Sequence, residues 1–168
     1  MNQAVQYLEQ VKTLMADKKP NVASFLLEHG REWEPSPLPI KFKRGVIKQC
    51  YKNAAQMALK FKELTYVEGY ANNIIPVSHA WCVDLAGRVI DNTWDNPEQQ
   101  EYFGIPFKTE FLRKFLLQAK DYSLLDQWRL GYPIQMGKHP KTGWFNDRFK
   151  TLSNLQKAPV VVSPDLGF

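Results

Sequence analysis

Three residues with the chemistry of a thiol-dependent acyl-transfer site follow one another along the chain: Cys50, His79 and Asp91. A cysteine thiolate can attack a carbonyl carbon, an imidazole can take the thiol proton and later return it, and a carboxylate can orient that imidazole. An ordinary cysteine has a pKa near ~8.5, so such a site needs a helix N-terminus or a cation beside the sulfur. The residue types and their order predict a Cys–His–Asp triad.

The residues around the triad predict the elements that would position it. Apolar residues recur at helical spacing over about 50–61, which favours a helix with Cys50 at its start. The runs 79–84 and 88–94 predict the two strands of a hairpin, with Ala86 and Gly87 in its turn. In that register position 79 lies opposite positions near 91 to 93, so the imidazole and the carboxylate would lie side by side.

The rest of the chain predicts further helices and one more strand. Hydrophobic periodicity and the breakers Pro20 and Gly30 indicate two N-terminal helices, the first over about 3–17. The proline-rich stretch 35–39 indicates an extended connection. The other expected elements are a strand over about 66–71, a helix capped by Thr109, a short helix around 124–128, and a mostly loop C-terminal part with a short strand at 160–162.

Length and composition indicate one folded domain over residues 1–168. Hydrophobic residues make up 44% of the chain and charged residues 23%, which is ordinary for a folded protein. We expect an N-terminal helical part over 1–40, a catalytic core over 41–107, and C-terminal helices with a basic, loop-rich tail over 108–168. The predicted class is α+β, with a cysteine-bearing helix packed on a small antiparallel sheet that carries the histidine and the aspartate.

The charge and cysteine content favour some partners and settings over others. The net charge of +5, from 22 Lys and Arg against 17 Asp and Glu, favours a solvated basic surface over a nucleic-acid partner. No apolar run approaches the ~20 residues that span a membrane, and we expect no signal peptide. Two cysteines do not form a disulfide framework, so the expected setting is the reducing cytoplasm.

We expect neither a cofactor nor a metal ion. His79 and Cys82 are residue types that bind metals, but on a strand these two positions face opposite sides. Three histidines and two cysteines in the whole chain also make a tetrahedral site hard to assemble.

Each member of the triad also has a purely structural interpretation. A lone cysteine is often a small core residue, a histidine beside aromatic residues often packs in the interior, and an aspartate after a strand often belongs to a turn. Asn92 is a second candidate for the orienting residue, because an asparagine amide oxygen can accept the same hydrogen bond. We favour Asp91 because of the turn that it opens.

The segments that carry the three residues resemble the transglutaminase-like superfamily, within the papain-like cysteine protease fold. Cys50 heads a helix and is followed by the aromatic Tyr51, His79-Ala80-Trp81 begins a strand, and Asp91-Asn92-Thr93-Trp94 ends the next one. The resemblance covers roughly residues 44–107, somewhat over a third of the chain. It implies that Cys50 is the nucleophile, His79 the base and then the acid, and Asp91 the orienting residue.

The chain departs from the family pattern around the cysteine. Lys48 and Tyr51 stand where the family commonly has glycine and tryptophan, and Arg44 stands where papain-like proteases place an oxyanion-binding glutamine. The backbone N–H of Cys50 is one candidate oxyanion donor, and Gln49 or Tyr51 is another. Trp81 and Gly69 are candidates for the walls of the cleft, since a glycine lets a substrate backbone approach closely.

The resemblance implies acyl chemistry through a thioester on a protein or peptide substrate. Peptide hydrolysis, cleavage of other amides, glutamine deamidation and transamidation all remain open, because they share the triad and differ in what attacks the acyl-enzyme. A different class of function is also open. The same scaffold could serve as a non-catalytic binding protein, such as a phage or bacterial effector that holds a host protein or a small ligand.

Overall fold

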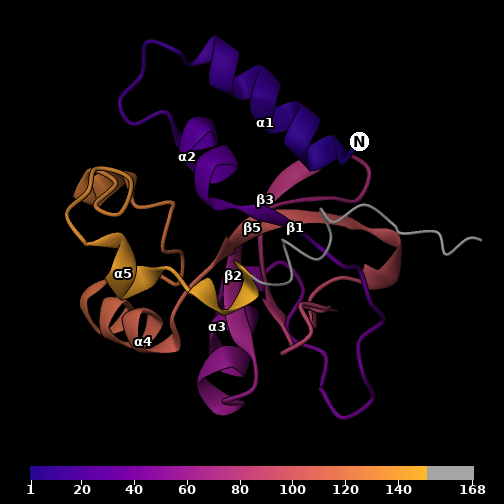
Figure 1. Ribbon diagram of the computed structural model, residues 1–168. Helices are drawn as coiled ribbons and strands as arrows, with labels where there is room; N and C mark the ends of the chain where they lie inside the picture. The colour runs from indigo at the N-terminus through magenta and orange to yellow at the C-terminus, as the bar shows by residue number, and fades with distance from the viewer. Residues whose placement is uncertain (151–168) are drawn as a thin grey trace, which may run out of the picture.

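The computed structural model describes residues 1–150, in which five helices pack around the strands of one sheet (Figure 1). The helices are α1 (Gln3–Leu14), α2 (Val22–His29), α3 (Cys50–Lys60), α4 (Thr109–Gln118) and α5 (Lys141–Trp144). The strands are β1 (Arg31–Trp33), β2 (Thr65–Asn72), β3 (Pro76–Val83), β4 (Val89–Ile90) and β5 (Glu101–Pro106). Short 3₁₀ turns lie at Pro97–Gln99, Trp128–Leu130 and Asp147–Phe149.

The five strands form one antiparallel sheet in the order β1-β5-β2-β3-β4, curled into a half-barrel. β2 and β3 pair along their whole length, from Thr65 opposite Val83 to Asn72 opposite Pro76. β5 pairs with the other side of β2, and β1 pairs with β5. Helices packed on an antiparallel sheet confirm the predicted α+β class.

Helices cover one face of this sheet. Alternate residues of a strand point to opposite faces, and on β3 Ala80 and Cys82 point toward α3, where the Cys82 thiol lies 3.2 Å from the carbonyl oxygen of Ala54. Figure 1 shows α1 and α2 at one end of the sheet and α3 and α4 at the other. Side chains from all four helices enter this core, among them Leu8, Leu26, Ala54, Met57, Leu112 and Phe115.

A smaller cluster, rich in aromatic rings, fills the opposite face of the sheet. Trp81 belongs to it and packs on Tyr102 of β5, with ring centroids 4.9 Å apart. His79 lies two residues before Trp81 on β3 and therefore points to the same face. The members of this cluster are Trp33, Val67, Ala71, Trp81, Val83, Val89, Tyr102 and Phe149.

The predicted hairpin is right in its turn and wrong in its second strand. Gly87 lies in the turn with a φ of 78°, and the Asp84 and Arg88 backbones are hydrogen-bonded across it. The expected strand over 88–94 shortens to β4, which pairs only with Cys82 and Val83. The chain leaves the sheet at Asp91, whose side chain accepts the backbone N–H groups of the next residues and so competes with the ladder.

Other expectations hold in part. The strand over 66–71, the extended stretch 35–39 and the two N-terminal helices are confirmed, although α1 ends at Leu14. Thr109 is the first residue of α4 and not its cap, a position that Lys108 takes. The sequence analysis missed β1 and β5, which are short or interrupted by glycine and proline. The strand expected at 160–162 lies outside the described residues.

The helix expected around 124–128 is wrong, and its absence matters for the site. The N–H groups of Leu124 and Leu125 donate to the buried carboxylate of Glu68, at 2.8 and 2.7 Å. These two bonds hold the segment against β2 as a loop, and the 3₁₀ turn at Trp128–Leu130 follows it.

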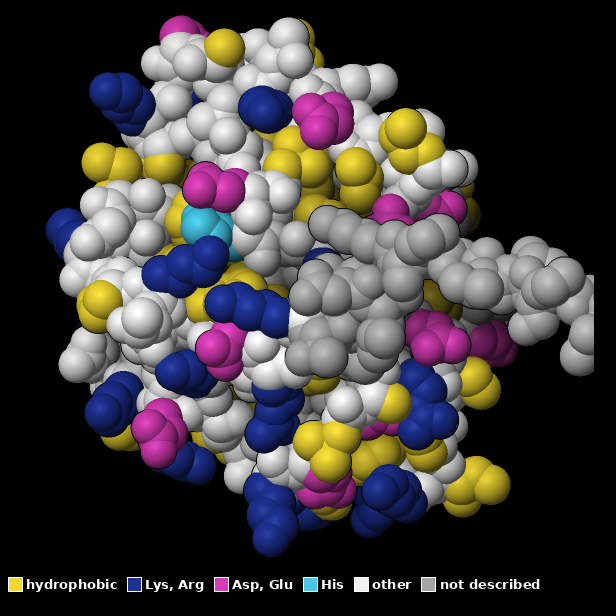
Figure 2. All heavy atoms as spheres, viewed as in Figure 1, with side chains coloured by type: hydrophobic (Ala, Val, Ile, Leu, Met, Phe, Trp, Pro, Cys, Tyr) yellow, Lys and Arg dark blue, Asp and Glu magenta, His cyan; other side chains and the backbone are white. Residues whose placement is uncertain are grey.

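Charged side chains of both signs share the surface. In Figure 2 Lys and Arg side chains gather over the lower part of the face shown, where α3 and α4 lie, with Asp and Glu side chains among them. Among residues 1–150, every helix falls short of the length and apolar character that a membrane crossing requires.

Candidate active site

Cys50 is the first residue of α3, so its half-buried side chain lies at the N-terminal end of that helix. Lys48 has a φ of 65°, and Gln49 is the N-cap residue, with no hydrogen bond from its side chain to the helix. The Asn53 N–H donates to the Gln49 carbonyl, so the N–H groups of residues 50–52 lie at the open end of the helix. Their partial positive charge favours an anion at this position.

His79 and Asp91 form a buried pair, as the sequence predicts. Nε2 of His79 lies 2.8 Å from Oδ2 of Asp91, and the two side chains are 2% and 1% exposed. The ring of Trp94 stacks on the imidazole, with centroids 4.1 Å apart and planes 20° apart. Because Asp91 occupies Nε2, the nitrogen left for the thiol of Cys50 is Nδ1.

The Asp91 carboxylate is surrounded by donors. Oδ2 accepts a second hydrogen bond, from the Tyr102 hydroxyl at 2.9 Å, besides the one from His79. Oδ1 accepts the backbone N–H groups of Thr93 and Trp94, at 2.9 and 3.4 Å. Four donors hold the ionised carboxylate in place, so it can orient the imidazole without itself moving.

The surroundings favour the charged forms of both partners. Burial alone would lower the pKa of His79, but hydrogen bonds with Asp91 and Cys50 raise it to about 9. Burial alone would raise the pKa of Asp91, but hydrogen bonds from His79, Thr93 and Tyr102 keep it below its usual range. At neutral pH the pair is therefore an imidazolium and a carboxylate, with the cation beside the thiol of Cys50.

Because β4 is short, Cys50 and the Asp91 turn can approach His79 on β3. β3 runs over eight residues, but β4 pairs only with Cys82 and Val83 at its end. His79 therefore lies on a part of β3 that β4 does not flank. The turn that begins at Asp91 and the start of α3 approach β3 there, which brings Cys50 to the histidine.

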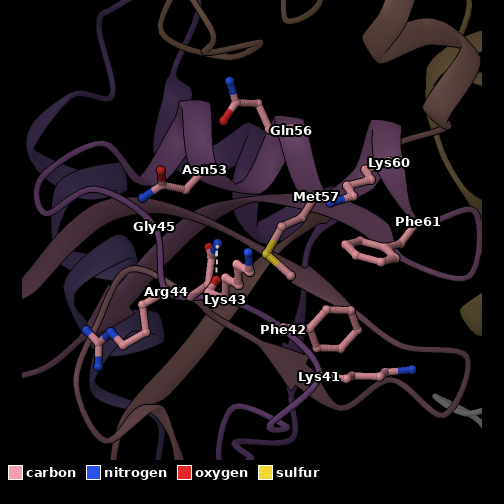
Figure 3. Close-up of a pocket in the computed structure, with 11 residues that line it drawn as sticks. Lys41, Phe42, Lys43, Arg44, Gly45, Asn53, Gln56, Met57, Lys60 and Phe61 are labelled. Carbon is pink, nitrogen blue, oxygen red and sulfur yellow. Dashed lines mark hydrogen bonds between the residues drawn. The ribbon is translucent and has the colours of Figure 1, made fainter.

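Asn53 joins the helix to this turn. Its Nδ2 donates to Oγ1 of Thr93 at 2.9 Å and to the carbonyl of Val46 at 2.8 Å, and its Oδ1 accepts the Val46 N–H at 3.2 Å. Figure 3 shows the Asn53 side chain on α3 beside Gly45. A Cβ at Gly45 would lie 2.3 Å from Asn53 Cγ, so only glycine fits under the amide. The Gly45 N–H in turn donates to the Asn92 carbonyl at 2.8 Å.

Two residues weighed from the sequence have other partners. The Asn92 amide donates to the Lys43 carbonyl at 3.2 Å, so Asp91 is the residue that contacts the imidazole. The Arg44 guanidinium forms an ion pair with Asp95 and donates to the Thr93 carbonyl at 3.3 Å. Arg44 therefore holds the turn after Asp91.

Gln49 and Tyr51 lie on either side of the cysteine in the chain. The Gln49 side chain is exposed, and it lines a surface hollow together with Tyr51. The Tyr51 phenol is largely buried and hydrogen-bonds with Ser78, the residue that precedes His79. Both candidates therefore lie next to Cys50.

Trp81 and Gly69 lie within the sheet. Trp81 is 1% exposed, and its ring lies 6.0 Å from the imidazole, centroid to centroid, so it supports His79 from within the protein. Gly69 is opposite His79 on one side and Gly104 on the other. A Cβ at Gly69 would lie 2.2 Å from the Phe103 carbonyl oxygen, so this glycine lets β5 approach β2.

Three supporting residues were missed by the sequence analysis: Tyr102, Asn53 and Glu68. The sequence pattern could have indicated Asn53, because it is a polar residue one helical turn before the buried Met57, on a helix face that should be apolar. The pattern could also have indicated Glu68, since it is a charged residue in the middle of an apolar strand. No local pattern indicates Tyr102, because its role depends on the pairing of β5.

Comparisons with known proteins do not assign a family. No family model, no curated protein and no solved structure matches the chain. Within the described residues, no group of three or more His, Cys, Asp and Glu side chains is arranged to hold a metal ion. The chemistry of the site is therefore argued from Cys50, His79 and Asp91 themselves.

Proposed function

We propose that this protein is a cysteine-dependent enzyme that cleaves or exchanges an amide bond of a protein or peptide through a thioester on Cys50. One observation carries the proposal: a buried, fully hydrogen-bonded His79–Asp91 pair adjoins a half-buried cysteine at a helix N-terminus. Burying an ion pair gives little stability in return for its desolvation, and apolar residues would fill the space as well. Such perturbed groups gather at functional sites.

We also infer that the scaffold is papain-like, of the transglutaminase-like type. The support is the combination of a cysteine at the first residue of a helix, a curled antiparallel sheet with the histidine on one strand, and an aspartate at the turn after the next strand. The short motifs His79-Ala80-Trp81 and Asp91-Asn92-Thr93-Trp94 agree with this inference.

The reaction would begin from a thiolate of Cys50 whose proton already lies on Nδ1 of the imidazolium of His79. The thiolate then attacks the amide carbonyl carbon and forms a tetrahedral intermediate. When this collapses, the C–N bond breaks, the amine leaves with the proton from His79, and a thioester remains on Cys50. His79 then takes a proton from water or from an amine, which attacks the thioester and releases the cysteine.

Asp91 and the start of α3 would supply the electrostatic part of this cycle. Asp91 holds the imidazole by Nε2 and stabilises its positive charge while Nδ1 carries the proton. The N–H of Cys50 is the first donor for the oxyanion, and the exposed Gln49 side chain is the second. The loss of one such donor typically costs about 10²–10³ in rate.

The test is alkylation of Cys50 by iodoacetamide, followed by peptide mapping. At about pH 6 an ordinary thiol reacts slowly, because little thiolate is present. We expect Cys50 to react at this pH, and the His79→Ala variant to react at least about tenfold more slowly. Cys82 is the internal control, because burial raises the pKa of its thiol. His139→Ala, a half-buried histidine outside the site, is the matched variant.

Equal labelling of Cys50 in the wild type and the His79→Ala variant would contradict the proposal. A second measurement detects the acyl-enzyme directly. The protein is incubated with a mixture of short peptide amides and quenched in acid, and its mass is measured by mass spectrometry. We expect an adduct that hydroxylamine removes and that the Cys50→Ser variant does not form as a thioester. A binding protein on the same scaffold would keep its ligand in Cys50→Ser and form no adduct in either protein.

A further inference from the structure

A pocket of about 210 Å³ adjoins the candidate active site. Three tyrosines line it, Tyr51, Tyr70 and Tyr132, together with the polar side chains of Ser78 and Asp126. We call it the Tyr51 pocket. Tyr51 follows Cys50 in the chain, and the charge of Cys50 acts on its phenol, so the Tyr51 side of the pocket lies close to Cys50.

The Tyr51 ring faces negative groups. Its phenol hydrogen-bonds with Ser78, which fixes the ring against β3. Burial is the first cause that raises the pKa of Tyr51, and the charges of Glu68, Cys50 and Asp126 act in the same direction. These three groups therefore lie close enough to the phenol to disfavour a further negative charge there.

The carboxylate of Glu68 accepts four hydrogen bonds from within the protein. It accepts the Tyr66 hydroxyl at 2.6 Å, the Ser123 hydroxyl at 2.9 Å, and the N–H groups of Leu124 and Leu125 at 2.8 and 2.7 Å. These bonds hold the 121–127 loop against β2 and so build one wall of the Tyr51 pocket. Glu68 has no acceptor capacity left for a ligand.

Asp126 is the carboxylate left to bind a ligand. Its backbone N–H donates to the Ser123 hydroxyl at 2.9 Å, and its side chain is exposed at the mouth of the pocket. Among residues 1–150, no lysine or arginine forms an ion pair with it, and none lines the Tyr51 pocket. Lys52 lines a neighbouring hollow that shares Tyr51 and Asp126, and Arg129 lines another that shares Asp126.

We propose that the Tyr51 pocket binds the side chain of a lysine or arginine next to the scissile amide, with Asp126 as its counter-ion. The inference rests on the function proposed above and names its substrate class. Tyrosine faces attract a cation, and the apolar stem of such a side chain packs along the rings while its charged head reaches the carboxylate. Asp126 is then the residue that sets the preference for positive charge.

Charged thiol reagents at Cys50 test this charge preference without a known substrate. Three methanethiosulfonates of similar size are compared, one cationic, one anionic and one neutral; each transfers its thioalkyl group to the thiolate and releases methanesulfinate. The readout is the ratio of the cationic to the anionic rate, divided by the same ratio for a free thiol. Asp126→Asn removes the charge, and Asp17→Asn, in the exposed connection after α1, is the matched control.

We expect this ratio to exceed one in the wild type and in Asp17→Asn, and to fall about three- to fivefold in Asp126→Asn, the size expected for one partly solvated charge. A ratio that Asp126→Asn leaves unchanged overturns the proposal. The neutral reagent separates the two ideas. If the neutral rate at Cys50 does not depend on His79, the enzymatic function fails, whereas the charge ratio still reports on the pocket.

A binding measurement removes the dependence on the thiol. Calorimetry on the Cys50→Ala variant compares an N-acetyl arginine amide with the citrulline amide, its neutral analogue of the same shape. We expect the arginine compound to bind more tightly than the citrulline compound. Adding Asp126→Asn to the Cys50→Ala variant should abolish binding of the arginine compound. Equal binding of both compounds, or of neither, overturns the proposal.

Discussion

The side chain of Asn53 donates a 2.9 Å hydrogen bond to Oγ1 of Thr93 and so ties the cysteine-bearing helix to the turn that holds the Asp91 carboxylate. Asn53 lies one turn after Cys50 on α3, and the N–H of Thr93 binds Asp91 directly. The geometry of the three candidate catalytic residues therefore depends on a residue whose side chain hydrogen-bonds with Val46 and Thr93 and not with any of the three.

Replacing Asn53 with alanine should loosen this connection. Val46 and Thr93 would lose their partners inside the protein, so we expect a loss of about 2–4 kcal/mol in the free energy of unfolding. We also expect slower alkylation of Cys50 under native conditions, because the histidine no longer has a fixed distance from the thiol. Urea unfolding and iodoacetamide labelling measure the two effects.

Gln56→Ala is the matched control for Asn53→Ala. Gln56 is exposed on the same helix and should change the free energy of unfolding by less than about 0.5 kcal/mol. Thr93→Val removes only the hydrogen bond to Asn53 and keeps the side-chain shape. If Thr93→Val labels at Cys50 as fast as the wild type, the connection does not serve the site.

The buried pair of His79 and Asp91 predicts how stability changes with pH. The pKa of His79 is raised to about 9, so its contribution is complete below its unfolded value of 6.5 and is lost as the pH rises through about 9. The pKa of Asp91 is lowered, so its contribution is present above the unfolded value of 3.8 and is lost as the pH falls below that. We expect the pair to stabilise most between these two limits.

Urea unfolding midpoints across this range, in the wild type and in Asp91→Asn, measure the effect. The asparagine cannot raise the pKa of His79 by its charge, so the decline in stability between 6.5 and about 9 should be much weaker in the variant. The two proteins share all other titrating groups. If the urea midpoints of the two proteins change in parallel above pH 6.5, His79 and Asp91 are not the charged pair described here.

Tyr102→Phe should separate stability from orientation. The change removes the hydroxyl that donates to Asp91 at 2.9 Å but keeps the ring that packs on Trp81. Since a hydrogen bond to a charged group contributes about 1.5–3 kcal/mol, we expect a loss of that size in the free energy of unfolding. Alkylation of Cys50 should stay within about threefold of the wild type, because two backbone N–H groups still hold the carboxylate. A collapse of labelling would show that the hydroxyl itself orients His79.

Glu68→Gln should release the 121–127 loop from the sheet. A glutamine places an NH₂ group against a backbone N–H of Leu124 or Leu125, so at least one buried donor loses its acceptor, at about 1–3 kcal/mol. Hydrogen exchange at these two amides should accelerate in the variant. Glu63→Gln, which alters only a long surface ion pair to Lys41 at 3.8 Å, should leave their exchange unchanged. If hydrogen exchange at these two amides is unchanged in Glu68→Gln, contacts other than those with Glu68 hold this loop against the sheet.

Features that depend on near neighbours could be predicted from the sequence. The periodicity after Cys50 indicated α3, the run over 66–71 indicated β2, and Gly87 indicated the turn of the hairpin, because helix, strand and turn chemistry act over a few residues. The expected strand bounds were wrong after Ile90, although the turn expected at Asp91 is present. The Asp91 carboxylate binds the N–H groups of Thr93 and Trp94, so the strand ends directly before it.

Only the tertiary structure decided how the three candidate residues meet. The sequence by itself determined their types and order, and the elements that begin at Cys50 and carry His79. The length of β4, the bond between Asn53 and Thr93 over 40 positions, and the anchoring of Ser123 by Glu68 over 55 positions depend on how distant strands and loops pack. Such contacts carry no local sequence pattern, because each residue's partner is supplied by the fold and not by its neighbours in the chain.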